Sequence, residues 1–168
     1  MIFLKKIVHI SINNDRCNKI GRHLYLPFIP FSQKPKNMNQ QLAHITILVD
    51  DYDKAISFYT KQLHFDLIED TSLSDSKRWV LVRPKGTGTC SLVLAKATTE
   101  EQVKSIGNQT GGRVFLFLYT DDITRDYQNL LQHQITIVEE PSVKAHGTVL
   151  VFADCYGNKW DLIEPMTR

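Results

Sequence analysis

A single histidine stands inside a stretch whose other residues favour a buried β-strand. In residues 42–49, LAHITILV, β-branched residues dominate and apolar side chains alternate with others, which is typical of a strand. His44 is the third residue of this stretch, and an imidazole titrates near neutral pH and is a common metal ligand. A polar ring at this position has two explanations: a structural histidine with satisfied hydrogen bonds, or a ligand that faces a cavity.

A second group of residues suits the binding of a small molecule. Aromatic side chains that face inward would give a cavity planar walls, and an arginine at its rim would hold a carboxylate or phosphate with paired hydrogen bonds. The alternative is that the phenylalanines belong to the core and that the arginine pairs with a surface acid. The candidate binding residues are Gln109, Arg113, Phe115, Phe117, Tyr156 and Trp160.

These residues must be positioned by two similar halves of the chain. The segments HITILVDDYDKAISFYTKQL and FLFLYTDDITRDYQNLLQHQ both run from an apolar strand through Asp-Asp into an amphipathic helix. Three further strands follow each helix, so the repeated unit is βαβββ. We therefore predict an α+β fold with module one at 41–97, a connector at 98–112 and module two at 113–165.

Strand periodicity predicts which side chains share a face. In the first strand, Ala43, Ile45 and Ile47 would pack against the helix, so His44 would point to the opposite face. In the last strand, Glu164 shares a face with Trp160, and Asp161 points the other way.

The tandem βαβββ plan, the opening LAHITILVDDYDKAISFYTKQLHFDL and the closing VFADCYGNKWDLIEP resemble the vicinal-oxygen-chelate superfamily. This superfamily includes glyoxalase I, extradiol dioxygenases and bleomycin-resistance proteins, and the chain is most similar to glyoxalase-like bacterial members. The resemblance implies a curved, mostly antiparallel eight-stranded cup with helices outside and the site within the cup.

The resemblance also implies a metal site, for which this sequence has an incomplete set of ligands. A histidine at the place of His44 commonly binds a divalent metal in the superfamily, and Glu164 resembles the carboxylate that closes the same site and moves a proton. Zn, Ni, Mn or Fe would suit this pair. The other ligand positions hold Val93 and the strand of Phe115 and Phe117, which offer no donor.

Two functions remain open. The first is a divalent-metal-assisted lyase or isomerase of the glyoxalase type, in which Glu164 is catalytic and the substrate carries vicinal oxygens. The second is a metal-free protein that binds or sequesters a small molecule, as bleomycin-resistance proteins do. An extradiol dioxygenase needs a second histidine ligand, and the sequence lacks one at the corresponding positions.

Composition sets the remaining expectations. Residues 1–37 carry seven basic residues and one acid, and we interpret them as a non-catalytic basic appendage before a domain at 38–168. The chain has three widely spaced cysteines and no apolar run long enough to cross a bilayer, which favours a cytoplasmic protein. We expect a homodimer that binds a small molecule and has no nucleic-acid or membrane partner.

Overall fold

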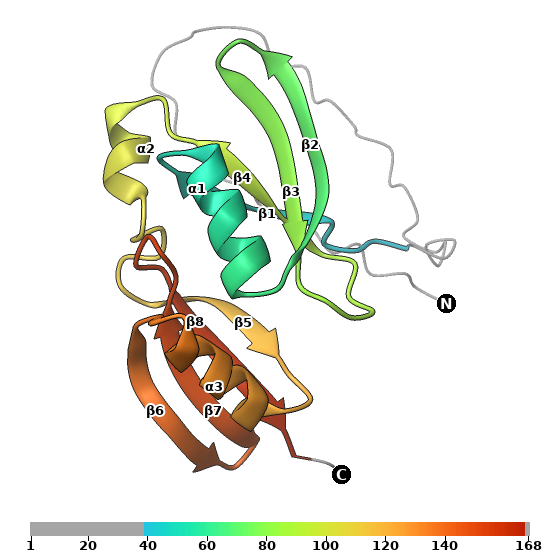
Figure 1. Ribbon diagram of the computed structural model, residues 1–168, viewed down its shortest axis with the longest axis vertical. Coiled ribbons are helices and arrows are strands. Elements are labelled where there is room, and N and C mark those ends of the chain that lie inside the picture. The colour runs from blue at the N-terminus through green and yellow to red at the C-terminus, as the bar shows by residue number, and fades with distance from the viewer. Residues whose placement is uncertain (1–38, 167–168) are drawn as a thin grey trace, which may run out of the picture. The chain divides into compact units, whose positions relative to one another are not determined.

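The computed structural model describes residues 39–166, which form two βαβββ modules (Figure 1). The predicted appendage at 1–37 lies outside the described residues. The elements of module one are β1 (His44–Val49), α1 (Tyr52–Ser57), the π-helical turn η1 (Phe58–Gln62), β2 (Asp66–Ser74), β3 (Lys77–Arg83) and β4 (Ser91–Lys96). After the connector helix α2 (Glu100–Ser105), module two consists of β5 (Val114–Tyr119), α3 (Ile123–Gln132), β6 (Ile137–Lys144), β7 (Gly147–Ala153) and β8 (Lys159–Pro165).

Each module contributes one four-stranded mixed sheet. The strand order is β1-β4-β3-β2 in the first sheet and β5-β8-β7-β6 in the second, so the two modules share one topology. In each sheet the first strand pairs in parallel with the last strand of its module, and the other neighbours are antiparallel. The predicted α+β class, the repeat and the eight strands are confirmed.

The repeated Asp-Asp starts both principal helices in the same way. The second aspartate of each pair is the N-cap: the Asp51 carboxylate accepts from the Lys54 amide at 2.9 Å, and the Asp122 carboxylate accepts from the Arg125 amide at 2.9 Å. These bonds satisfy amides that have no partner inside the helix. A local sequence signal, the Asp-Asp pair, therefore sets the residue at which α1 and α3 begin.

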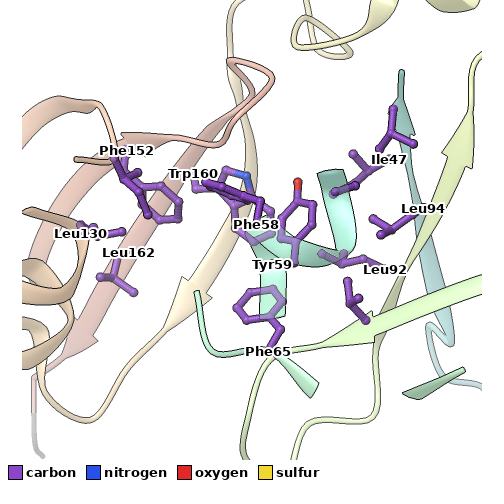
Figure 2. Packing of buried hydrophobic residues seen from close by; sticks show 14 of the residues in the cluster. Ile47, Phe58, Tyr59, Phe65, Leu92, Leu94, Leu130, Phe152, Trp160 and Leu162 are labelled. Atoms are coloured by element: carbon purple, nitrogen blue, oxygen red, sulfur yellow. The ribbon is translucent and has the colours of Figure 1, made fainter. Parts of the chain in front are cut away.

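The helix-facing sides of both sheets contribute to one apolar core. Ile47, Leu92 and Leu94 of the first sheet and Phe152, Trp160 and Leu162 of the second belong to the same buried cluster. Figure 2 shows Tyr59 of η1 between Trp160 and the pair Leu92 and Leu94. The Tyr59 ring lies 6.2 Å from the Trp160 ring and stacks on Phe65 at 5.9 Å. The modules thus pack through their helices, and each sheet keeps one open face.

A buried carboxylate lies at this junction. Asp154, in the turn between β7 and β8, is 5% exposed, and its Oδ2 accepts from the Tyr59 hydroxyl at 2.8 Å. The same oxygen accepts from Asn158 Nδ2 at 3.0 Å and from Trp160 Nε1 at 3.3 Å, while Oδ1 accepts from the amides of Tyr156 and Asn158. Burial and the neighbouring Asp154 charge raise the pKa of Tyr59 well above its ordinary value, so Tyr59 remains a donor.

No helix in residues 39–166 is both long and apolar enough to span a membrane.

The Tyr59–Asp154 hydrogen bond predicts a measurable contribution to stability. Tyr59→Phe removes one donor from a buried carboxylate, so we expect the free energy of unfolding to fall by about 2 kcal/mol in urea denaturation. Tyr127→Phe is the matched control because the Tyr127 hydroxyl bonds to the exposed Glu140, and its effect should stay within about 0.5 kcal/mol. Equal effects in the two variants would contradict a special role for the buried bond.

Candidate functional site

The open face of the first sheet carries His44. Ile47 and Val49 are buried on the helix side of β1, while His44 and Thr46 are exposed on the opposite side, as the alternation predicted. The His44 ring meets the half-buried Trp79 of β3 edge-on, with 6.0 Å between ring centroids. This contact places an imidazole and an indole on one surface, where both are available to a ligand.

The side chain of Gln109 forms hydrogen bonds with the backbone at the outer edge of β1. Its Oε1 accepts from the Leu48 amide at 2.7 Å, and its Nε2 donates to the Thr46 carbonyl at 3.1 Å. The connector that carries Gln109 also packs closely on the turn before β8, because a Cβ at Gly107 (φ +74°) would lie 1.8 Å from the Tyr156 carbonyl oxygen. The hydrogen-bonding capacity that was predicted for a substrate is therefore used by the β1 backbone.

The last strand shows the predicted alternation, but the side assigned to the cavity was wrong. Trp160 is 2% exposed and lies in the core with Leu162, so Trp160 does not line an open face. Glu164 is on the same side and accepts from the Ile123 amide at 2.9 Å, at the first residue of α3. A carboxylate is favourable there because helix N-terminal amides lack partners and carry partial positive charge.

The reverse side of β8 presents a carboxylate that was not among the predicted site residues. Asp161 is paired in register with Phe117 of β5 and with Val151 of β7, and Val151 is paired with Glu139 of β6. These four side chains form one row across the open face of the second sheet. Once Trp160 is assigned to the core, alternation alone identifies Asp161 as an open-face residue.

The aromatic residues of β5 differ in how much of each side chain is exposed. Phe115 occupies a bulge between the paired residues Val114 and Leu116 and packs against the core. Phe117 and Tyr119 are 64% and 71% exposed, which is unusual for such large side chains. Arg113 is exposed just before β5 and forms no ion pair with any residue in the range 39–166.

The turn before β8 holds Tyr156 and Cys155. The Tyr156 hydroxyl donates to the Asp51 carbonyl at 3.2 Å, its ring lies 4.8 Å from Lys54 Nζ, and burial raises the pKa of its hydroxyl. The Cys155 side chain is exposed, but partial desolvation, and then the Asp154 charge, raise the pKa of its thiol. A raised pKa disfavours the thiolate that a nucleophile needs.

A cleft of about 790 Å³ is lined by residues of both modules beside α3. Its apolar wall includes Phe65 and Leu118, and its polar rim includes His64 and Arg125. The rim groups are already engaged: His64 Nε2 lies 2.9 Å from Asn129 Oδ1, and Arg125 pairs with Asp121 and Asp126. Both of these rim side chains therefore already have partners, and Tyr119 of β5 also lines the cleft.

A family model described as the Glyoxalase/Bleomycin resistance protein/Dioxygenase superfamily matches residues 41–162, which span both modules. The chain belongs to this superfamily. An uncharacterised protein of Shewanella frigidimarina (strain NCIMB 400) is 52% identical over 128 residues, which cover 76% of this chain and 95% of that protein.

Two solved structures of similar proteins cover most of the superfamily domain. The crystal structure of UcmS2 is 31% identical with a TM-score of 0.66, and the match covers 76% of this chain and 99% of that one. TnmS3, an antibiotic-binding protein from Streptomyces sp. CB03234, is 28% identical with a TM-score of 0.62, and the match covers 76% of this chain and 98% of that one. Membership of the superfamily does not by itself decide between catalysis and binding.

Within one chain, the two side chains that were predicted to bind a metal do not come together. His44 lies on the open face of the first sheet, whereas Glu164 lies on the helix side of the second and caps α3. Within residues 39–166, no three His, Cys, Asp or Glu side chains gather closely enough to hold a metal ion. The His44–Glu164 pair therefore supports no metal-dependent step.

The cross-strand row on the second sheet lets us predict how its members shift the pKa of Asp161. Burial, and then the Glu139 charge, raise the pKa of Asp161, and His146 opposes them. We expect Glu139→Gln to lower the pKa of Asp161 and His146→Gln to raise it further, as measured by carbon-detected NMR titration. Glu140→Gln is the control, and an Asp161 pKa that ignores Glu139 would contradict the proximity of the two carboxylates.

The sign of the accompanying change in stability follows from the direction of the shift. Because the pKa of Asp161 is raised in the folded state, its contribution to stability is fully present below the ordinary pKa of 3.8 and is lost as pH rises through the folded value.

Proposed function

We propose that this protein binds and sequesters a small aromatic or amphipathic molecule without a metal ion. The observation that carries the proposal is the open face of the second sheet, where Phe117 and Tyr119 remain 64% and 71% exposed. Large exposed aromatic side chains that lie near a few polar groups mark a binding site more often than a solvated face. We propose the open sheet faces, rather than the cleft, as the place of binding.

The chemistry of these faces supports a planar ligand. Phe117 lies beside Asp161 in the cross-strand row, and the neighbouring side chains on the same side of the sheet, Val149, Val151 and Ile163, are apolar and buried. On the first sheet, His44 and Trp79 offer an imidazole and an indole in edge-on contact. Stacking on such rings holds a flat apolar molecule, and the carboxylate and the imidazole can orient its polar groups.

Similarity to a binding protein supports the same class of function. TnmS3 is described as an antibiotic-binding protein and shares 28% identity with this chain at a TM-score of 0.62. We extend to this chain only the capacity to hold a small organic molecule. The expected homodimer and the cytoplasmic location, which rests on cysteine usage, are parts of this proposal.

Binding can be tested with a panel of flat probes of different charge: anthraquinone, acridine orange and anilinonaphthalene sulfonate. We expect at least one probe to bind saturably, and Phe117→Ala to weaken that binding about tenfold because one stacking partner is lost. Val103→Ala is the control, since Val103 is an exposed residue of α2 and belongs to neither sheet.

Calorimetry measures the affinity, and Trp79 fluorescence, assigned with Trp79→Phe, reports on the first sheet. Loss of binding that is equal in the Phe117 and Val103 variants, or no saturable binding of any probe, would contradict the proposal.

A metal-assisted lyase or isomerase is the second candidate, and one observation favours it: His44 and Asp161 both project from open faces. They belong to different sheets, so a metal site would need donors from a second copy or from the substrate. His44 and an open-face carboxylate would hold the ion, which would polarise vicinal oxygens of the substrate.

Elemental analysis distinguishes the two candidates. We expect the protein, purified without a polyhistidine tag, to contain well below one Zn, Ni, Mn or Fe per chain, and His44→Ala to leave that content unchanged. Metal near one per chain that disappears in His44→Ala, but not in the control His146→Ala, would establish the second candidate instead.

A further inference from the structure

A row of polar side chains crosses the first sheet at the start of β1. His44 of β1 is in register with Ser91 of β4. Val82 of β3 is paired with Leu92 of β4, so the next residues of these antiparallel strands, Arg83 and Ser91, are also neighbours. Neighbours in register share one side of a sheet. An imidazole, a hydroxyl and a guanidinium therefore lie next to one another.

Burial shows that this row belongs to the open face. Val82 and Leu92 are part of the core, and alternation places Arg83 and Ser91 on the opposite side, with His44. Ser91 is 3% exposed and Arg83 is half-buried. The middle of the row is thus recessed in the sheet.

The charge of Arg83 has no counterpart among the described residues. Arg83 forms no ion pair with any residue in the range 39–166, and its neighbour in β2, Asp66, pairs instead with Lys85 at 2.6 Å. Arg78 of the same strand shows the contrast, since it pairs with Asp53 and Asp70. A half-buried guanidinium favours an anionic partner, because it has lost part of its hydration and its paired donors match a carboxylate.

The repeat shows that the fold itself does not require this arginine. The equivalent row of module two consists of Val114, Lys159 and Ala153. Ala153 stands where module one has Arg83, and Lys159 Nζ donates to the Gly112 carbonyl at 3.0 Å. The same topology forms without a guanidinium at this place, so a structural role does not account for Arg83.

An aromatic and apolar surface adjoins the polar row. Trp79 lies on the same side of β3 as Arg83, four residues or about 13 Å along the strand, and its ring meets the His44 ring edge-on at 6.0 Å. The row between them contains Leu81 and Val93, which are paired in register. This arrangement suits fused rings that carry one anionic group at the end near Arg83.

We propose that the row of His44, Ser91 and Arg83 binds the carboxylate of a flat aromatic ligand, whose rings lie on the apolar row beside Trp79. The inference rests on the proposed binding function and adds the charge of the ligand. Arg83 would hold the carboxylate by paired hydrogen bonds, and His44 and Ser91 offer further donors. Arg83 then determines specificity for an anionic ligand over a neutral one.

The test compares 2-naphthoate with 2-naphthamide, which has the same rings and a neutral amide in place of the carboxylate. We expect calorimetry to show about tenfold tighter binding of 2-naphthoate to the unmodified protein, and Arg83→Gln to abolish this preference. Lys77→Gln is the matched control. It removes the same charge from the same side of β3, at an exposed residue six positions away, and should retain the preference.

NMR of the unmodified protein gives a readout that does not depend on a variant. The Arg83 Nε–Hε resonance should shift on addition of 2-naphthoate and stay in place with 2-naphthamide, and circular dichroism checks the fold of both variants. Equal affinity for the two compounds, or a preference that survives in Arg83→Gln, would overturn the charge assignment and leave the binding function intact. No saturable binding of either compound would overturn the proposal, whereas the binding function fails only if the whole probe panel also fails to bind.

Discussion

The buried carboxylate of Asp154 is the interaction on which the arrangement of the modules depends. It accepts hydrogen bonds from Tyr59 of module one and from Tyr156, Asn158 and Trp160 of module two. A charge removed from water is tolerated only when its lone pairs are occupied, and here five donors satisfy it. The same bonds orient Tyr59 and Trp160, whose rings join the cores of the modules.

Because this junction joins the helix sides of the sheets, the opposite sides are left for the binding that we propose. The side chains that project from open faces are those of His44, Trp79, Phe117 and Asp161. In contrast, Trp160 is buried in the core, and Glu164 accepts a hydrogen bond from the amide at the start of α3. The burial of one side thus explains why aromatic residues stay exposed on the other. It also leaves His44 on the open side of one sheet and Glu164 on the helix side of the other.

Local signals made much of this architecture predictable. The repeated Asp-Asp marked the starts of α1 and α3, because an aspartate at an N-cap satisfies amides within three residues of itself. Alternation correctly placed His44 opposite Ile47 in β1. The roles of Glu164 and Gln109 were not predictable in this way. Their partners, Ile123 and the β1 backbone, lie 41 and about 60 residues away in the sequence.

The sequence by itself determined the repeat, the helix starts, the superfamily and the sets of residues that share a face. Only the tertiary structure decided which face of each sheet is covered. Alternation divides Trp160 from Asp161 without stating which of them meets the core, since either side of a strand can be buried. Packing of Trp160 against Tyr59 and Phe152 settled that question, and it left Asp161 and Phe117 on the open side.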